Sequence, residues 1–441
     1  MRRHLRIGVI ELISYTVASE WATLIGVPSF KRQFYSIMPQ AISTWCRQDG
    51  HAVTYATYYG QASSPLRLLP DELDIVFIVA STQASALAYA LARLYRARGV
   101  RTVLGGPHAK CFPMDSARFF DITVGQCDRA LLRDIIAGDV APGSVVASAK
   151  APTSLPSVPD RMADIATAAF HNGRPMRSSI ISLLASMGCP YDCAFCTDWN
   201  STYHPVNRDA LAADLAFIAD RYPGVLLGFH DPNFGIRIDD ALDCMEQIPP
   251  HRRSRYLMQC SLGVLNNSRL TRLQNTGCLY MAPGIESWSA FDRKLRLGQR
   301  KGLDRVMILA ERFTELRHFV PGLQANFVVG LDTDAGDEPF ELTRRFVRDV
   351  PFVWPNINIL TPYGGTPIHE QMQSSGRLLS AMPLALYCSP YLTIMPKNYE
   401  ALDFYQRFVR LQEDSVSLSL TRRRLRPSGH VAPFIATIAQ T

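Results

Sequence analysis

Three cysteines in one short loop are the residues of this chain whose types and spacing could do chemistry. Cys189, Cys193 and Cys196 follow the spacing C-x3-C-x2-C within the stretch GCPYDCAFC. Thiolates bind soft metals, but a closed zinc site takes four ligands, usually as two separated pairs, and the sequence has no second C-x2-C pair. The spacing therefore predicts a soft-metal site that lacks one protein ligand; the alternative is three buried structural cysteines.

The sequence around this loop indicates how the cysteines are positioned. The apolar run SIISLL over residues 179–184 is short enough to be a buried strand, and Gly188 and Pro190 then begin a loop. The cysteines are therefore expected just beyond the C-terminal end of a strand. In barrel-like α/β folds, that is the edge at which reactive groups collect.

An aromatic residue, Phe195, directly precedes the last cysteine. With it, the motif resembles the signature of the radical S-adenosylmethionine (SAM) enzymes, in which three cysteines hold a [4Fe-4S] cluster and the open iron binds SAM. The resemblance implies that Cys189, Cys193 and Cys196 bind this cluster and that Phe195 lies beside the cofactors. It also implies reductive cleavage of SAM to a 5′-deoxyadenosyl radical, with an electron donor such as flavodoxin or ferredoxin.

Composition sets broad limits on the protein. The 441 residues predict two to three domains, and a net charge of +7 permits acidic ligands without indicating nucleic-acid binding. The ten cysteines show no paired spacing outside the loop, so we expect no disulfide framework and a reducing, cytoplasmic location. No stretch of about 18 uninterrupted apolar residues occurs, so no transmembrane segment is expected, and the apolar N-terminus is interpreted as a strand.

Strands and helices alternate over residues 1–150, which predicts an α/β, doubly wound, Rossmann-like parallel sheet. The expected strands are 5–12, 52–58, 74–80, 100–104 and 120–124, and the expected helices are 37–47 and 87–98. Ligands bind such sheets at the C-terminal ends of the strands. Two loops follow strands there: Ser81-Thr82-Gln83 and Gly105-Gly106.

This segment resembles the cobalamin-binding domain that precedes the radical SAM domain in one large subfamily. The resemblance rests on the strand order, the STQ loop and the stretch VLGGPH, and it implies that both loops contact cobalamin. The sequence DGHAVT at 49–54 resembles the start of a cobalt-ligating motif, but Thr54 replaces its glycine and His51 lies at the wrong turn. We interpret His51 as an ordinary turn residue. The family's acidic turn is replaced by GQCD at 125–128, so a cofactor-free scaffold is the alternative.

The rest of the chain divides into three predicted parts. Residues 151–178 are rich in Pro and Ser and predict an extended linker. Residues 179–380 predict six β/α units and hence an open partial barrel, and residues 381–441 predict a helical cap containing a helix over 399–412. The expected barrel strands are 179–184, 225–229, 256–260, 277–287, 323–329 and 357–360, and the expected helices are 208–221, 267–275, 303–314 and 341–348.

Polar motifs stand where these barrel strands end. DPNF (231–234), GIES (284–287), VVGLD (328–332) and PYGGTP (362–367) resemble strand-end motifs of cobalamin-dependent radical SAM proteins. The resemblance implies that SAM is contacted by Asp231, Asn233, Glu286, Ser287 and Gly330. Glu286 would contact the SAM amine or ribose, and Gly330 would form the turn beside the adenine. Each could instead be a plain turn former or surface group.

These observations imply a radical SAM enzyme whose leading function is cobalamin-dependent C-methylation of a small biosynthetic substrate. Two alternatives stay open: a cyclisation, ring contraction or rearrangement without methyl transfer, and a non-catalytic metal-binding scaffold. The sequence names neither the substrate nor a catalytic acid or base.

Overall fold

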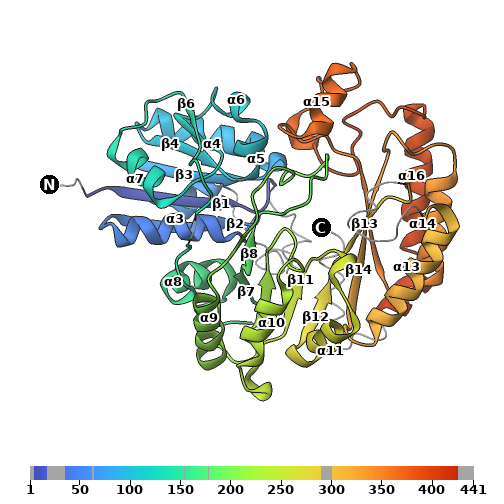
Figure 1. Ribbon diagram of the computed structural model, residues 1–441. Coiled ribbons are helices and arrows are strands. Elements are labelled where there is room, and N and C mark those ends of the chain that lie inside the picture. Colours follow the sequence, from blue (N-terminus) through green and yellow to red (C-terminus); the bar gives the residue numbers. More distant parts are fainter. Residues whose placement is uncertain are drawn as a thin grey trace.

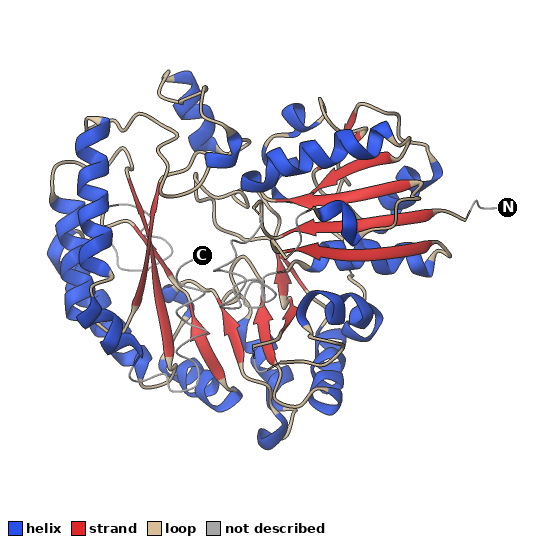
Figure 2. Cartoon of the chain, turned by 180° about the vertical axis from the view of Figure 1, so that it is seen from behind, coloured by secondary structure: helices blue, strands red, loops and turns tan. Residues whose placement is uncertain are grey.

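The computed structural model describes residues 4–16, 35–61, 64–152, 154–176, 178–289 and 300–425. It contains two parallel sheets, each flanked by helices (Figure 1). Figure 2 shows that the arrowheads of both sheets are directed toward the same central region of the molecule. The C-terminal edges of the two sheets therefore face each other. Among the described residues, no helix is both long and apolar enough to cross a membrane.

The N-terminal sheet confirms the predicted doubly wound arrangement. In the described part of the chain its strands are all parallel and follow the order β2-β1-β3-β4-β5-β6. The strands are β1 (Arg6–Leu12), β2 (Ala52–Tyr58), β3 (Ile75–Ala80), β4 (Arg101–Gly105), β5 (Ile122–Val124) and β6 (Ser144–Val146). The helices are α3 (Ile37–Gln48), α4 (Ser85–Ala97), α5 (Pro107–Cys111), α6 (Pro113–Ser116) and α7 (Arg129–Ala137). Strand order reverses at β1 and β3, and ligands bind such sheets at this switch point.

The expectation of an extended linker is wrong for helix α8 (Val158–Ala169). Ser157 accepts a hydrogen bond from the Asp160 amide, and the Asp160 carboxylate accepts one from the Ser157 amide, so the sequence SVPD forms a capping box. Pro159 stands in the first turn, where a missing amide proton costs nothing. The proline that suggested an extended chain is therefore part of a helix start. The exact domain boundaries stay a prediction.

The second sheet confirms an open barrel with six strand positions. Its strands are β7 (Ile180–Leu183), β10 (Leu226–Phe229), β11 (Tyr256–Met258), β12 (Cys278–Met281), β13 (Gly284–Glu286), β14 (Gly322–Val329) and β15 (Trp354–Ile359). The predicted strand 277–287 is divided into β12 and β13, which pair in succession with β14. Pro283 lies at the division and cannot donate to the ladder. Within the described residues β7 and β15 do not pair, so the barrel stays open.

Helices cover the outer face of this barrel (Figure 1). They are α9 (Arg208–Arg221), α10 (Ile238–Glu246), α11 (Asn267–Thr276), α13 (Gly302–Arg317) and α14 (Glu338–Asp349), and α15 (Pro367–Ser374) follows the last strand. The sequence analysis missed α10. Its apolar positions, such as Leu242 and Met245, are buried against the sheet.

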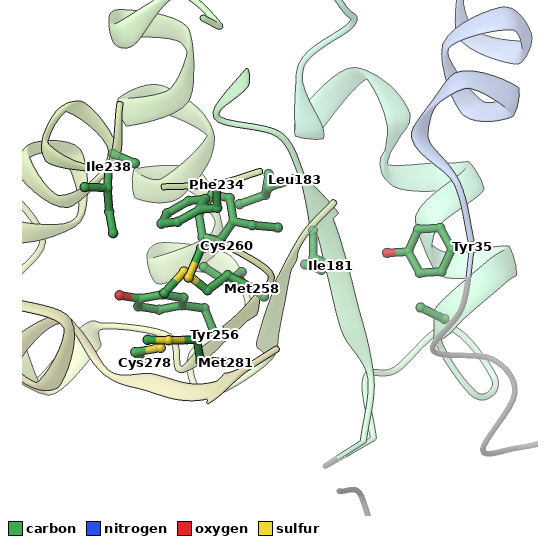
Figure 3. Packing of buried hydrophobic residues seen from close by; sticks show 14 of the residues in the cluster. Tyr35, Ile181, Leu183, Phe234, Ile238, Tyr256, Met258, Cys260, Cys278 and Met281 are labelled. Atoms are coloured by element: carbon green, nitrogen blue, oxygen red, sulfur yellow. The ribbon is translucent and has the colours of Figure 1, made fainter. Parts of the chain in front are cut away.

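Buried contacts join the two sheets into one body. The Tyr35 hydroxyl donates to the carbonyl of Ile180 at 2.6 Å and accepts from the amide of Ser182 at 3.0 Å. Figure 3 shows Tyr35 directed at this strand from the side opposite the barrel core. A single apolar cluster includes residues of both sheets, such as Val9 and Leu227. The relative position of the two C-terminal edges is therefore fixed by packing.

The C-terminal segment forms helices α16 (Ala401–Ser415) and α17 (Leu418–Leu425), as the predicted helical cap requires, and residues 426–441 lie outside the described part. Phe404 of α16 is fully buried and its ring lies 5.9 Å from Phe340 and 5.5 Å from Tyr399. Its Cζ would lie 3.0 Å from a Cβ placed on Gly330. The cap thus packs directly on the turn after β14.

We expect Phe404→Ala to lower the free energy of unfolding by about 3–5 kcal/mol, because it leaves a cavity between α16 and the barrel. Leu402 lies in the same helix with 71% of its surface exposed, so Leu402→Ala should change stability by only about 0.5 kcal/mol. Chemical denaturation of both variants tests this. Equal losses in the two variants would contradict the docking of α16.

Candidate active site

The cysteine loop is closed at its base by a short ribbon. Strand β8 (Ser186–Met187) pairs antiparallel with β9 (His204–Pro205), and the loop between them carries the three cysteines. Gly188 has φ +71°, and a Cβ placed on it would lie 2.2 Å from the carbonyl oxygen of Thr202. The close approach of the two loop ends therefore requires glycine at this position.

Asp231, from the turn after β10, fixes the start of this loop. One carboxylate oxygen accepts from the Ala185 amide at 3.0 Å and the other accepts from the Ser186 hydroxyl at 2.6 Å. The side chain is fully buried, and this burial raises the pKa of Asp231 to about 6. These contacts make Asp231 a positioning residue for the cysteine loop, and its predicted direct contact with SAM stays a prediction.

The ten cysteines differ in how deeply they are buried. Burial raises the pKa of the seven outside the loop, which are Cys46, Cys111, Cys127, Cys244, Cys260, Cys278 and Cys388. In the loop Cys193 is buried as well, whereas Cys189 and Cys196 are half-buried, as is Cys388; the Cys196 sulfur accepts from the Asp198 amide at 3.4 Å. Amide-to-sulfur hydrogen bonds of this kind tune the potential of bound clusters.

The chemistry of the donor set, three thiols in one loop, fits an iron–sulfur cluster. In the described residues, no three His, Cys, Asp or Glu side chains converge on one metal ion. A cubane binds each cysteine at a separate iron, so its sulfurs need not meet at one point. Three loop cysteines would hold three irons of a [4Fe-4S] cluster and leave the fourth without a protein ligand.

A polar cavity opens beside the loop at the C-terminal ends of the barrel strands. Its polar and loop-facing lining comprises Phe195, Cys196, Asp198, Asn233, Gln259, Ser261, Glu286 and Asn326. The structure thus brings the predicted Phe195, Asn233 and Glu286 together with Cys196. Both charged side chains among the described lining residues, Asp198 and Glu286, are carboxylates. SAM carries a sulfonium and an ammonium against one carboxylate, so the cavity has the charge that this cation requires.

Glu286 adopts a strained backbone conformation. Its φ is +65°, in the left-handed region that non-glycine residues rarely adopt. Asn326 steadies this edge, because its Nδ2 donates to the carbonyls of Ala282 and Pro283 at 3.3 and 3.2 Å. Sequence analysis missed Gln259, Ser261 and Asn326. Ser261 could have been inferred only through Asn233. The Asn233 Nδ2 donates to the Ser261 hydroxyl at 2.6 Å, and the Asn233 Oδ1 accepts from the Ser261 backbone amide at 3.1 Å.

Besides Asp231, two predicted SAM contacts, Ser287 and Gly330, lie outside this cavity lining. Ser287 is buried, and its hydroxyl lies 3.3 Å from that of Ser289. Gly330 has φ +90°, and its amide donates to the Asp334 carboxylate at 2.9 Å. Gly330 is thus a turn glycine, as its motif implied, and its place beside the adenine stays a prediction.

A second cavity, mostly apolar, lies at the C-terminal edge of the N-terminal sheet. Its walls come from β3, β4, β5 and α3 and include Met38, Ile42, Phe77, Val79, Val103 and Val124. Gly105 and Gly106 are in its lining; a Cβ on Gly105 would meet nothing within 4 Å, whereas a Cβ on Gly106 would lie 2.8 Å from Cγ1 of Val79. Their contact with cobalamin stays a prediction. The lining also includes Thr197 and Asp198 of the cysteine loop. Apolar walls and the open space beside Gly105 fit a large, flat organic cofactor such as cobalamin.

The other predicted cobalamin loop has different contacts. Ser81 precedes a short 3-10 helix, Thr82 is buried, and Gln83 donates to the Tyr363 hydroxyl at 3.2 Å and the Tyr387 carbonyl at 2.9 Å. These three residues do not line the apolar cavity, so their contact with cobalamin stays a prediction. His51 is a turn residue, as interpreted, and lies before β2 at the opposite edge of the sheet. No histidine is among the described residues lining the apolar cavity.

Comparison with known proteins agrees with this geometry, although no protein-family model matches the chain. Bacteriochlorophyllide d C-12(1)-methyltransferase of Chlorobaculum tepidum is 23% identical over 358 residues, which cover 80% of this chain and 76% of the relative. The C-8(2)-methyltransferase of the same organism is 25% identical, covering 77% of each chain. Hopanoid C-3 methylase of Methylococcus capsulatus is 28% identical over 53% of this chain and 43% of the relative.

The fold is shared with a solved radical SAM methyltransferase, TsrM of Kitasatospora setae. The form with cobalamin and a [4Fe-4S] cluster superimposes with a TM-score of 0.55 at 12% identity, over 85% of this chain and 75% of TsrM. The form with tryptophan substrate and a SAM analogue gives a TM-score of 0.60 over 95% and 90%. The two sheets and the cysteine loop are therefore the architecture of a cobalamin-binding radical SAM protein. The chain is a radical SAM enzyme of the class with an N-terminal cobalamin-binding domain, the class that these methyltransferases represent.

We expect Gly188→Ala to prevent stable cluster assembly, because its Cβ would collide with the Thr202 carbonyl and force the loop ends apart. Gly224 has a similar φ of +81° but open space around it, so Gly224→Ala carries the backbone strain, of order 1 kcal/mol, without the collision. Iron and acid-labile sulfide after anaerobic reconstitution provide the measurement. Full iron content in Gly188→Ala would contradict the account of the loop.

Proposed function

We propose that this chain transfers a methyl group to a carbon atom of a small biosynthetic molecule bound between its two sheets. One observation carries the proposal: the polar cavity and the apolar cavity share a lining residue, Asp198, which belongs to the cysteine loop. A SAM site, a cluster site and a cobalamin site would therefore meet at one place. When bound, these cofactors supply radical generation and methyl transfer, and the protein supplies orientation and exclusion of water.

The residues of the chain have separate roles in this proposal. Cys189, Cys193 and Cys196 would hold the cluster, and Glu286 would accept hydrogen bonds from the SAM ammonium or ribose. Gly105 would allow the cobalamin to approach the N-terminal sheet closely, and Gly106 would hold the turn beside it against Val79. None of the described residues that line that cavity is a histidine, so a bound cobalt would take no histidine ligand from them.

The surroundings of the reaction follow from the cofactors. A cluster with an open iron is oxygen-sensitive, so we propose a cytoplasmic location, consistent with ten cysteines that form no disulfide with one another. A small one-electron carrier of the flavodoxin or ferredoxin type would reduce the cluster. The relatives act on bacteriochlorophyllides, hopanoids and, for TsrM, tryptophan, so the reaction type rather than the substrate is common to them.

The test begins with anaerobically purified protein that is reconstituted with iron, sulfide and cobalamin. We expect tightly bound corrinoid and formation of 5′-deoxyadenosine and S-adenosylhomocysteine after reduction, both lost in Cys189→Ala. Cells fed methyl-labelled methionine should contain a product that gains one labelled methyl group only when the chain is present. 5′-Deoxyadenosine with no methylated product would favour a rearrangement, and neither nucleoside, with the cluster intact, would favour a scaffold.

We expect Glu286→Gln to weaken SAM binding to the reconstituted protein by roughly 10- to 100-fold. A hydrogen bond to a charged group contributes about 1.5–3 kcal/mol, which corresponds to roughly 10- to 100-fold in affinity. The substitution removes the charge of the side chain and keeps its size. Glu413 lies exposed on α16, so Glu413→Gln is the matched control. Equilibrium binding of SAM measures the effect, and equal affinity in both variants would remove Glu286 from the SAM site.

A further inference from the structure

Lys110 of α5, in the N-terminal domain, contacts the C-terminal part of the cysteine loop, after Cys196. Its ammonium donates to the Asp198 carboxylate at 2.9 Å and to the Ser201 hydroxyl at 3.2 Å. Asp198 donates its amide to the Cys196 sulfur, and the Ser201 carbonyl accepts from the Cys189 amide at 3.3 Å. The Lys110 ammonium is therefore linked to Cys196 through Asp198 and to Cys189 through Ser201.

Packing holds Lys110 in this place. A Cβ on Gly364 would lie 2.1 Å from the carbonyl oxygen of Cys111, so the last turn of α5 touches the loop after β15. The Phe112 ring lies 5.5 Å from that of Tyr387, edge to face. The loop after β15 in turn binds the cysteine loop, because Trp199 donates its indole proton to the Gly365 carbonyl at 2.9 Å.

The Lys110–Asp198 ion pair contributes little to stability, but it lies where its charges affect the electrostatic potential at the cysteine loop. Lys110 is 39% exposed and Asp198 is 35% exposed, and ion pairs at this exposure contribute little to stability. Lys110 and Asp198 are also the two charged residues among the described lining of the apolar cavity. They therefore act at the boundary between the two domains.

We propose that Lys110 and Asp198 form a bridge through which the N-terminal domain sets the reduction potential of the cluster. This proposal rests on the proposed function, because it requires the cluster. Reduction adds one electron, and so one negative charge, to the cluster. A nearby cation favours the reduced form and a nearby carboxylate disfavours it, and the net charge around a cluster is one determinant of its potential.

The signs of the expected effects follow from this charge balance. Lys110→Met leaves the Asp198 carboxylate uncompensated, so the potential should fall. Asp198→Asn leaves the Lys110 ammonium uncompensated, so the potential should rise. The substitution keeps the hydrogen bond from the backbone amide of residue 198 to the Cys196 sulfur. The double variant removes both charges and should return close to the wild-type value, and Lys110→Arg should also stay close to it.

An EPR-monitored redox titration with dithionite as reductant measures these shifts in the reconstituted full-length protein without SAM. Lys150, exposed after the edge strand β6, supplies the control Lys150→Met, which should leave the potential unchanged. The single-variant shifts should shrink near 1 M salt, where the screening length falls to about 3 Å. If the ion pair only supported the conformation of the loop, both single variants would instead shift the reduction potential in the same direction.

The outcomes separate this proposal from the proposed function. Opposite shifts in the two single variants, cancelled in the double variant, would establish the bridge. Shifts of the same sign, or none, in variants with full iron content would overturn it while leaving the radical SAM assignment intact. Failure of the wild-type protein to bind a cluster at all would overturn the proposed function itself.

Discussion

The site depends on one constraint: the C-terminal edges of two parallel sheets are held facing each other. Parallel sheets expose their strand-end loops on a single edge, and ligands bind there. Tyr35 and a shared apolar core lock the two edges in place. The cysteine loop is the part of the barrel that reaches across, and Asp198 consequently lines a cavity on each side of it.

Three separate features position the cysteine loop. Gly188 lets its ends approach, the buried carboxylate of Asp231 fixes its start, and Lys110 contacts it from the other domain. Each feature uses a different kind of interaction: backbone freedom, buried hydrogen bonds and a half-exposed ion pair. The ion pair is half-exposed, so either of its charges can be removed by substitution with little effect on stability.

Much of this could be predicted from the sequence, because the signals are local. The cysteine spacing, the alternation of strands and helices, and the motifs containing Asn233 and Glu286 are each contained within a few consecutive residues. Buried β3, with all six residues apolar and buried, illustrates how directly such a run predicts a covered strand. The resemblance to cobalamin-dependent radical SAM enzymes was accordingly visible before the fold.

The remaining features arise from packing between distant segments. Gln259 and Asn326 enter the polar cavity only because their strands are neighbours of β12 and β13, and Lys110 meets Asp198 across 88 residues. Gln83 stood in the expected loop, but Tyr363 and Tyr387 engage its side chain. Helix α8 was missed because a proline read as a linker signal serves equally as a first-turn residue.

The central claim is that three cysteines leave one cluster iron open to a ligand in the cavity lined by Glu286. Electron-nuclear double resonance on the reduced, reconstituted protein tests it directly, with SAM labelled with ¹⁵N in its amino group. The account predicts a hyperfine coupling between the cluster and this nitrogen. An intact cluster that binds SAM without such a coupling, or that shows a fourth protein ligand, would contradict it.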